Sequence, residues 1–246
     1  MGSRLDILGW RAFDMVFQPW MKRRLQLRIA DLPQDLDASE PVMLVANHVS
    51  WWDGFVLRAI QMRLRPSSAL YTIALERELN QHSILRAIGG IGIEPDSPDS
   101  ILRAVRQFQA KRRKLPDAVF GYFPQGCITA SFRRPLGFRR GVELFARAIA
   151  PVTIVPVAIH IEPGVCLAPT AFVSVGAPIH CVESVDHLLL EREIHDLLDA
   201  TYAFLAEHGE SSAADWPPVV AQVVNRLSHR APVTAAEPVA VAMRVH

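Results

Sequence analysis

The chain has 246 residues and 50% of them are hydrophobic, so it is able to bury a large core and is not expected to be globally disordered. Its 26 Lys and Arg and 25 Asp and Glu give a formal net charge of +1, which argues against a nucleic-acid-binding protein but leaves room for local basic patches. The 3 cysteines, Cys127, Cys166 and Cys181, lack metal-ligand spacing, which indicates a reduced, intracellular protein without disulfides or bound metal.

The first predicted element is an amphipathic helix at residues 3–21. Its aromatic residues fall on one stripe, and the basic run Lys22-Arg23-Arg24 follows at once. This combination suits a helix that lies in the bilayer interface, and the alternative is a helix that packs on the domain. Pro19 is expected to kink or end the helix. No apolar stretch of ~18 or more residues is present, so no transmembrane helix is predicted. Charged residues interrupt the region after Met1, so no signal peptide is predicted. The aromatic stripe consists of Trp10, Phe13, Phe17 and Trp20.

Beyond residue 40, apolar runs typical of strands alternate with segments of helical periodicity, which indicates an α/β fold with helices on both faces of the sheet. After Gly209 the composition changes to Ala, Pro, Val and Ser, and residues 211–246 are predicted to be a partly disordered extension. The predicted strands are 42–46, 69–74, 91–93, 118–123, 152–161 and 171–175. The predicted helices are 55–62, 81–88, 98–114 with Ser97 as N-cap, 141–148 and 188–208.

One polar segment, Asn47-His48-Val49-Ser50-Trp51-Trp52-Asp53-Gly54, directly follows the first apolar strand of this region. Functional sites in open α/β sheets lie at the carboxyl ends of strands. Asp53 is near enough in sequence to bend back and hold one imidazole nitrogen of His48, which would leave the other nitrogen free to accept a proton.

Three further motifs follow in order. The second is Gly90-Ile91-Gly92-Ile93-Glu94-Pro95, the third is Phe123-Pro124-Gln125-Gly126 followed by Phe138-Arg139-Arg140-Gly141, and the fourth is Ile154-Val155-Pro156-Val157. Together with the spacing of His48 and Asp53, they resemble the lysophospholipid and glycerol-phosphate acyltransferase superfamily, which includes 1-acyl-glycerol-3-phosphate acyltransferases. The resemblance covers residues 40 to 180.

The resemblance implies a mixed, mostly parallel sheet of about seven strands flanked by helices. It divides the chain into a membrane-associating helix and connector (1–35), an acyltransferase domain (36–210) and the C-terminal extension (211–246). The implied enzyme is a peripheral protein at the cytoplasmic face of the cell membrane, bound through its N-terminal helix. It would need no cofactor and would use acyl-CoA or acyl carrier protein as the acyl donor.

In the implied mechanism His48 is the general base that deprotonates a hydroxyl of the lipid acceptor, and Asp53 orients the imidazole. Asn47 would fix the loop or donate to a substrate oxygen, and Trp51 and Trp52 would either line a substrate groove or pack in the core. The predicted substrate-binding residues are Asn47, Trp51, Trp52, Phe123, Pro124, Gln125, Gly126, Arg139 and Arg140.

Two positions depart from the pattern of the family. Pro95 stands where many members have an Arg that binds the phosphate of the acceptor, and Gln125 stands where Glu is usual. These departures favour a neutral acceptor, such as a glycolipid or another lipid alcohol. Two alternatives stay open: a phosphate-bearing acceptor bound by the cluster Arg133, Arg134, Arg139 and Arg140, and an inactive lipid-binding relative.

Overall fold

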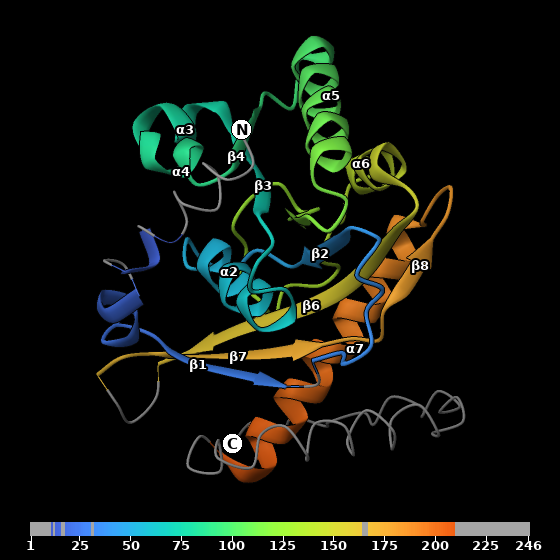
Figure 1. Ribbon diagram of the computed structural model, residues 1–246. Coiled ribbons are helices and arrows are strands. Elements are labelled where there is room, and N and C mark those ends of the chain that lie inside the picture. The colour runs from blue at the N-terminus through green and yellow to red at the C-terminus, as the bar shows by residue number, and fades with distance from the viewer. Residues whose placement is uncertain (1–10, 12, 16–17, 31, 164–166, 210–246) are drawn as a thin grey trace, which may run out of the picture.

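The computed structural model describes residues 11, 13–15, 18–30, 32–163 and 167–209. They form an eight-stranded sheet in which seven strands follow the order β1-β7-β6-β2-β5-β3-β4 and β8 pairs with β6 (Figure 1). The strands are β1 (Gln26–Ala30), β2 (Val42–Ala46), β3 (Leu70–Leu75), β4 (Gly90–Ile93), β5 (Val119–Tyr122), β6 (Val152–Glu162), β7 (Thr170–Val175) and β8 (Ile179–Cys181).

The sheet is mixed and mostly parallel, which confirms the predicted fold class. β2 lies at its centre between β5 and β6 and runs parallel to both, whereas β6 is antiparallel to β7 and β8. All five residues of β2 are buried, as is expected for a parallel strand covered on both faces. The carboxyl ends of β2 and β6 point to the left-hand side of Figure 1.

Helices cover both faces of the sheet. The helix α2 packs on one face through Val56, Leu57 and Ile60, and α5, α6 and α7 pack on the other. Ser97 caps α5 by accepting a hydrogen bond from the Ser100 amide, as predicted. The helices are α2 (Asp53–Leu64), α3 (Glu76–Gln81), α4 (Ser83–Ala87), α5 (Pro98–Lys114), α6 (Gly141–Ile149) and α7 (His187–His208).

Three elements differ from the sequence-based prediction. β1 and β8 were not predicted, because short, partly polar segments acquire strand structure only by pairing with β7 and β6 far along the chain. The single helix predicted at residues 81–88 is instead the pair α3 and α4. β1 lies within the stretch 1–35, so part of that stretch belongs to the sheet. The proposed boundaries at 35 and 210 stay predictions, and residues 211–246 lie outside the described part.

In the N-terminal segment, residues 11, 13–15 and 18–22 are helical, so Pro19 lies within a helical stretch and does not end it. The segment is attached to α2 by stacking of Phe13 on Phe55 at 5.8 Å between ring centroids and by an ion pair of 2.6 Å between Asp14 and Arg58. This helix therefore packs on the domain. Trp10 and Phe17 of the predicted stripe lie outside the described residues. No helix of the described part is long and apolar enough to cross a membrane.

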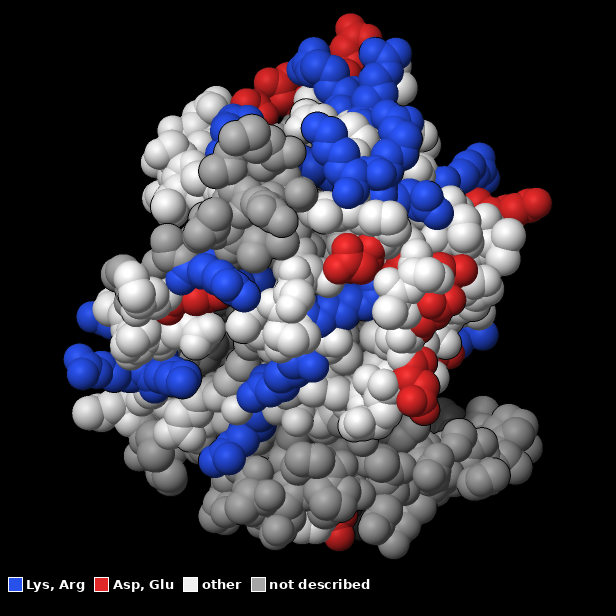
Figure 2. Space-filling view, viewed as in Figure 1, with Lys and Arg blue, Asp and Glu red and all other residues white. Residues whose placement is uncertain are grey.

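A local basic patch exists despite the near-neutral net charge. In Figure 2 the lysine and arginine side chains gather over α5. This helix exposes Arg103, Arg106, Arg113 and Lys114, and none of the four has an ion-pair partner among the described residues.

Candidate active site

His48 and Asp53 lie at the carboxyl end of β2, where the chain turns into α2. The distance between His48 Nδ1 and Asp53 Oδ2 is 2.7 Å. Asp53 is the first residue of α2 and is fully buried, whereas the His48 side chain is 23% exposed. The structure therefore brings the predicted pair into contact, with the acid in the interior and the imidazole reaching the surface.

The buried Asp53 carboxylate is satisfied by four donors. Besides the imidazole, the Val49 and Ser50 amides donate to Oδ2 at 2.6 and 2.9 Å, and the Ser50 hydroxyl donates to Oδ1 at 2.8 Å. Burying a carboxylate without such partners would lower the free energy of unfolding by several kcal/mol. The positive end of the α2 dipole also stabilises the negative charge of Asp53. Because every donor comes from residues 48–50, the same contacts that stabilise Asp53 also hold the His48 loop.

This geometry assigns the proton positions on the imidazole. An ionised Asp53 only accepts, so His48 Nδ1 carries the hydrogen and Nε2 is left with its lone pair. Nε2 has no protein partner within the described chain. The ring also stacks on Phe123, which follows β5, at 4.4 Å between centroids and 20° between planes. The imidazole is thus held on two sides and is able to act as a base through Nε2.

Gln125 connects the third motif to the loop that carries His48. Its Oε1 accepts from the His48 amide at 2.6 Å, and its Nε2 donates to Thr129 Oγ1 at 2.6 Å and to the Leu136 carbonyl at 3.1 Å. The Thr129 amide in turn donates to the His48 carbonyl at 2.8 Å. Gln125 is buried and all its contacts are internal, so it positions His48. Its predicted contact with substrate stays a prediction.

Asn47 fixes the other side of the loop. Its Nδ2 donates to the Ile159 carbonyl at 2.9 Å and its Oδ1 accepts from the Ile159 amide at 2.7 Å, so the side chain extends the pairing of β2 with β6. The side chain is fully buried. Of the two roles predicted for Asn47, the structure supports the fixing of the loop.

Replacing Asn47 with alanine is expected to lower the free energy of unfolding by about 2–4 kcal/mol, because the buried amide and carbonyl of Ile159 would both lose their partner. Urea unfolding at pH 7 measures the change. Asn80→Ala, at an exposed position on α3, is the control and should change stability by less than about 0.5 kcal/mol. Equal stability of the two variants would show that the Asn47 contacts are dispensable.

Trp51 and Trp52 differ in burial: Trp52 is partly buried and packs against the core on the α2 side of the sheet, whereas Trp51 does not. Trp51 is 54% exposed, and its ring lies 4.2 Å from that of Trp52. Trp20 of the N-terminal helix contacts both rings at 6.1 and 5.4 Å, and the guanidinium of Arg24 lies over the Trp20 ring at 4.9 Å. The N-terminal helix and the first motif therefore share one aromatic cluster, which is consistent with either an interfacial or a substrate-lining role.

The four arginines after Gly126 do not form one cluster of free charges. Arg134 pairs with Asp199 at 2.7 Å and Arg140 with Glu143 at 3.2 Å. Arg133 and Arg139 have no ion-pair partner in the described part of the chain.

Arg139 contacts the first part of the third motif, residues 123–126. Its amide donates to the Pro124 carbonyl at 3.1 Å. Its guanidinium lies beside Gly126, at 3.7 Å from the position that a Cβ on this residue would take. The φ of 70° at Gly126 favours glycine. Burial raises the pKa of the adjacent Tyr122 to about 12, and the charge of Arg139 opposes that shift. Gly126 and Arg139 are therefore adjacent, as predicted for one site, whereas Arg140 extends into solvent.

Two groups of residues at the site were missed from the sequence. The first is Ser50, whose amide and hydroxyl bind Asp53; Trp52 and not Ser50 is the N-cap of α2, so this contact is not helix capping. The second joins the loop after Gly126 to β6: Ser131 Oγ lies 2.8 Å from His160 Nδ1, and His160 Nε2 lies 3.1 Å from Glu162. Burial lowers the pKa of His160, which Glu162 opposes, and Ser131 is itself buried. These contacts fasten the loop to the sheet, and no sequence spacing signals them.

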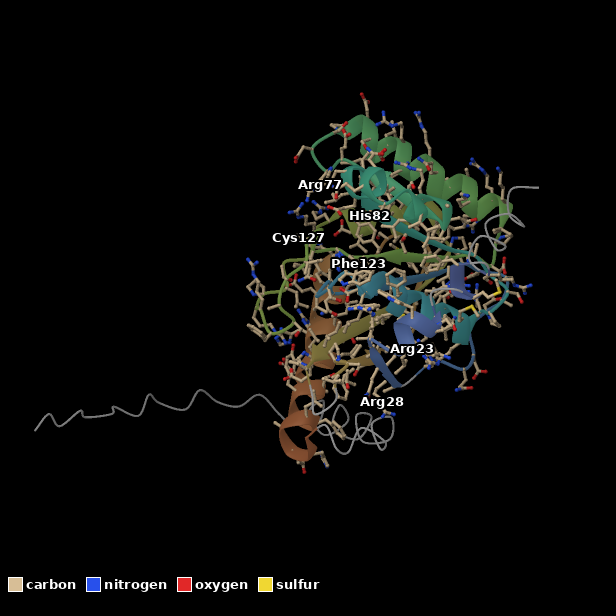
Figure 3. The ribbon with its side chains drawn as sticks, turned by 90° about the vertical axis from the view of Figure 1, so that its left-hand side faces the viewer. Arg23, Arg28, Arg77, His82, Phe123 and Cys127 are labelled. Atoms are coloured by element: carbon tan, nitrogen blue, oxygen red, sulfur yellow. The ribbon has the colours of Figure 1, made fainter. Side chains whose placement is uncertain are left out.

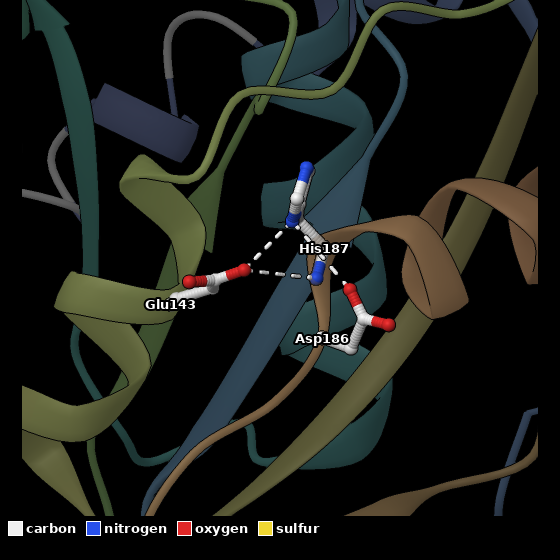
Figure 4. A group of neighbouring side chains, drawn as sticks. All are labelled: Glu143, Asp186 and His187. Atoms are coloured by element: carbon white, nitrogen blue, oxygen red, sulfur yellow. Dashed lines mark hydrogen bonds and ion pairs between the residues drawn. The ribbon is translucent and has the colours of Figure 1, made fainter.

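One group among the described residues has the ligand types for a metal ion: Glu143, Asp186 and His187 (Figure 4). His187 Nδ1 lies 2.7 Å from Glu143 Oε1 and 3.5 Å from Asp186. The hydrogen bond from His187, followed by that from Arg140, lowers the pKa of Glu143. Because the Arg140 cation already contacts Glu143, the group ties α6 to α7 without needing a metal. The expectation of no metal stays a prediction.

Comparison with known proteins identifies the family. The acyltransferase family model matches residues 28–160, a stretch that is more than half of the chain and includes all four motifs. The chain therefore belongs to the acyltransferase family and is an acyltransferase, as the motifs predicted. Among solved structures it is similar to the 1-acyl-sn-glycerophosphate (LPA) acyltransferase PlsC from Thermotoga maritima, at 18% identity and a TM-score of 0.47, covering 82% of this chain and 78% of that chain. No curated protein sequence matches it.

Proposed function

We propose that this acyltransferase moves a fatty acyl group from acyl-CoA or acyl carrier protein to a hydroxyl of a lipid acceptor at the membrane surface. The observation that carries the proposal is the 2.7 Å contact between His48 Nδ1 and a buried Asp53, which leaves Nε2 as an available base at the carboxyl end of β2. Base and orienting acid in this relation activate hydroxyl groups on many unrelated folds.

The reaction needs one proton transfer to His48 and one proton transfer from it. The acceptor oxygen attacks the thioester carbonyl carbon while His48 Nε2 takes the hydroxyl proton, and Asp53 stabilises the imidazolium that forms. The tetrahedral intermediate then collapses to the ester and expels the thiolate, which takes the proton from Nε2. No acyl-enzyme is required. Among the described residues, the hydrogen-bond partner of Cys127 Sγ is the Gln125 carbonyl at 3.8 Å, and a carbonyl is not a base that activates a thiol.

A neutral acceptor is favoured by the charges at the end of the sheet that carries the second motif. Glu94 is exposed there next to Pro95. Of the cations on α3 and α4, Arg86 is bound by Glu76 at 2.7 Å and Arg77 by Glu78 at 3.3 Å. α3 and α4 therefore present paired cations beside a free acid, which is a poor environment for a phosphate group, and the unpaired cations nearby lie on α5.

The unpaired Arg139 favours the second candidate, a phosphate-bearing acceptor such as 1-acyl-glycerol 3-phosphate. With a neutral acceptor, we expect Arg139→Ser to change the KM for that acceptor by less than about threefold. A phosphate bound by Arg139 would lose a charge-assisted hydrogen bond, which corresponds to a rise in KM of about 10- to 100-fold. Arg140→Ser is the matched control, because its side chain is 81% exposed and pairs only with Glu143. A large rise for Arg139→Ser alone would contradict the neutral acceptor.

A peripheral location is part of the proposal. Trp20 and Trp51 are partly exposed, adjacent to each other and close to the basic residues Arg23 and Arg24, and such groups favour the bilayer interface. The acceptor hydroxyl would then reach His48 from the headgroup region.

The direct test is incubation of the full chain with labelled acyl-CoA or acyl carrier protein and a mixture of neutral glycolipids, lipid alcohols and lysophospholipids. We expect a labelled ester of a neutral lipid, and its chemistry would identify the acceptor. The absence of any labelled lipid with both donors would favour an inactive lipid-binding relative instead.

A further inference from the structure

The loop after the third motif presents apolar side chains to solvent. We call residues 127–134 the rim loop. In it Ile128 is 55% exposed and Phe132 is 76% exposed, and the exposed cation Arg133 lies beside Phe132. Single exposed apolar residues are common on soluble proteins, so this observation gains meaning only from its setting.

The rim loop is held in place at three points. The Thr129 amide donates to the His48 carbonyl at 2.8 Å, Ser131 contacts His160 at 2.8 Å, and Arg134 pairs with Asp199 at 2.7 Å. Ile128 and Phe132 are therefore exposed on a loop that is fastened directly to the catalytic histidine and to β6. Their exposure is a feature of the folded state.

The rim loop shares one face of the molecule with the N-terminal helix. Figure 3, which looks onto the carboxyl ends of β2 and β6, shows Cys127 of the rim loop and Arg23 after the N-terminal helix on either side of Phe123. Phe123 stacks on His48, so it marks the catalytic site. Trp20 and Trp51 are 37% and 54% exposed on the side of the N-terminal helix. Apolar side chains with adjacent cations thus flank the site on two sides.

We propose that the rim loop is a second membrane-contact element, which inserts Ile128 and Phe132 into the same leaflet as Trp20 and Trp51. The inference rests on the proposed function. Its occupant is a lipid bilayer with anionic headgroups, because exposed apolar side chains beside unpaired cations match both the acyl region and the charge of such a surface. The bilayer then covers the edge of the sheet where His48 lies and keeps bulk water from the thioester.

Vesicle flotation with the full chain tests the proposal, using vesicles of 70% neutral and 30% anionic phospholipid. The variant Ile128→Ser/Phe132→Ser should lower the partition coefficient between vesicles and water at least tenfold, because the transfer of a serine side chain into the bilayer is much less favourable than that of Ile or Phe. The control Leu102→Ser/Leu144→Ser removes side chains of 46% and 43% exposure on α5 and α6, outside the rim loop, and should change it less than twofold. Matching melting temperatures establish that all three proteins are folded.

Acyl transfer separates this proposal from the proposed function. The rim-loop variant should keep the wild-type rate with a water-soluble, short-chain donor and acceptor, and lose rate only with an acceptor embedded in vesicles. Vesicle binding equal to wild type would overturn the proposal, as would an equal loss of rate with soluble substrates, which would place Ile128 and Phe132 in the substrate site. Wild-type protein that binds vesicles but transfers no acyl group would contradict the proposed function alone.

Discussion

Replacing His48 with alanine is expected to lower the turnover of acyl transfer by about 10²- to 10⁴-fold, the usual contribution of a positioned general base. The imidazole has its Nδ1 hydrogen bound by the buried Asp53 and its Nε2 without a protein partner, so no other described group can replace it at this position. Initial rates of ester formation from a labelled thioester, measured at saturating donor and acceptor, give the change.

His82→Ala is the control for this prediction, because His82 is exposed on the same face of the molecule (Figure 3) and, among the described residues, makes no hydrogen bond with the first motif. It should retain wild-type turnover. The fold of His48→Ala must be intact for the comparison, which near-unchanged unfolding in urea would establish. A His48→Ala protein that keeps full turnover would remove the general base from the mechanism.

Gln125→Glu is expected to lower the free energy of unfolding by about 2–4 kcal/mol at pH 7 and to reduce turnover at least tenfold. Glutamate is the usual residue in the family that the chain resembles, but here the amide nitrogen of Gln125 donates to the Leu136 carbonyl at 3.1 Å. A carboxylate oxygen in that place would face a carbonyl oxygen in a buried site. Because Gln125 also holds the His48 amide, the damage should extend to the base.

The sign of the pH dependence follows from the same contact. Burial and the Leu136 carbonyl would raise the pKa of the introduced carboxyl in the folded state. The loss of stability that this carboxyl causes is therefore small below a pH of about 4.3, which is its pKa in the unfolded state. The loss grows as the pH rises towards the pKa of the folded state. Urea unfolding of Gln125→Glu and wild type at pH 5 and pH 8 should show a larger deficit at pH 8.

Gln125→Met is the matched control for Gln125→Glu, because it removes the same hydrogen bonds without adding a titratable group. Its deficit relative to wild type should be the same at pH 5 and pH 8. If Gln125→Glu were as stable as wild type at both values, the Leu136 carbonyl would not be the feature that selects an amide at this position.

The parts of the fold that were predictable are those with a local signal. The uninterrupted apolar run before Asn47 indicated a buried strand, and Ser97 followed by Pro98 marked the start of α5. The pairing of His48 with Asp53 was also predictable, because six consecutive residues at a strand-to-helix turn bring the two side chains together. β1 and β8 lacked such a signal, since each depends on a partner strand that is remote in sequence.

The contacts that were not predictable join segments far apart in the chain. Gln125 was correctly seen as a hydrogen-bonding residue, yet its partners are the backbones of His48 and Leu136, which only the folded structure brings together. The basic run after Gly126 left a phosphate site open as an alternative, but Arg134 pairs with Asp199, which is remote in sequence, and Arg140 pairs with Glu143 three residues along the chain. Spacing alone cannot show which charges are paired.

Single turnover of the wild-type enzyme with a labelled acyl thioester is the most direct measurement of direct transfer driven by the His48–Asp53 pair. Protein and lipid are separated after rapid quenching, with and without the acceptor lipid. We predict label in the lipid ester only when acceptor is present, no label on the protein at any time, and neither product with His48→Ala. Label that appears on the protein before it appears in lipid, for example at Cys127 or Ser131, would contradict a direct transfer.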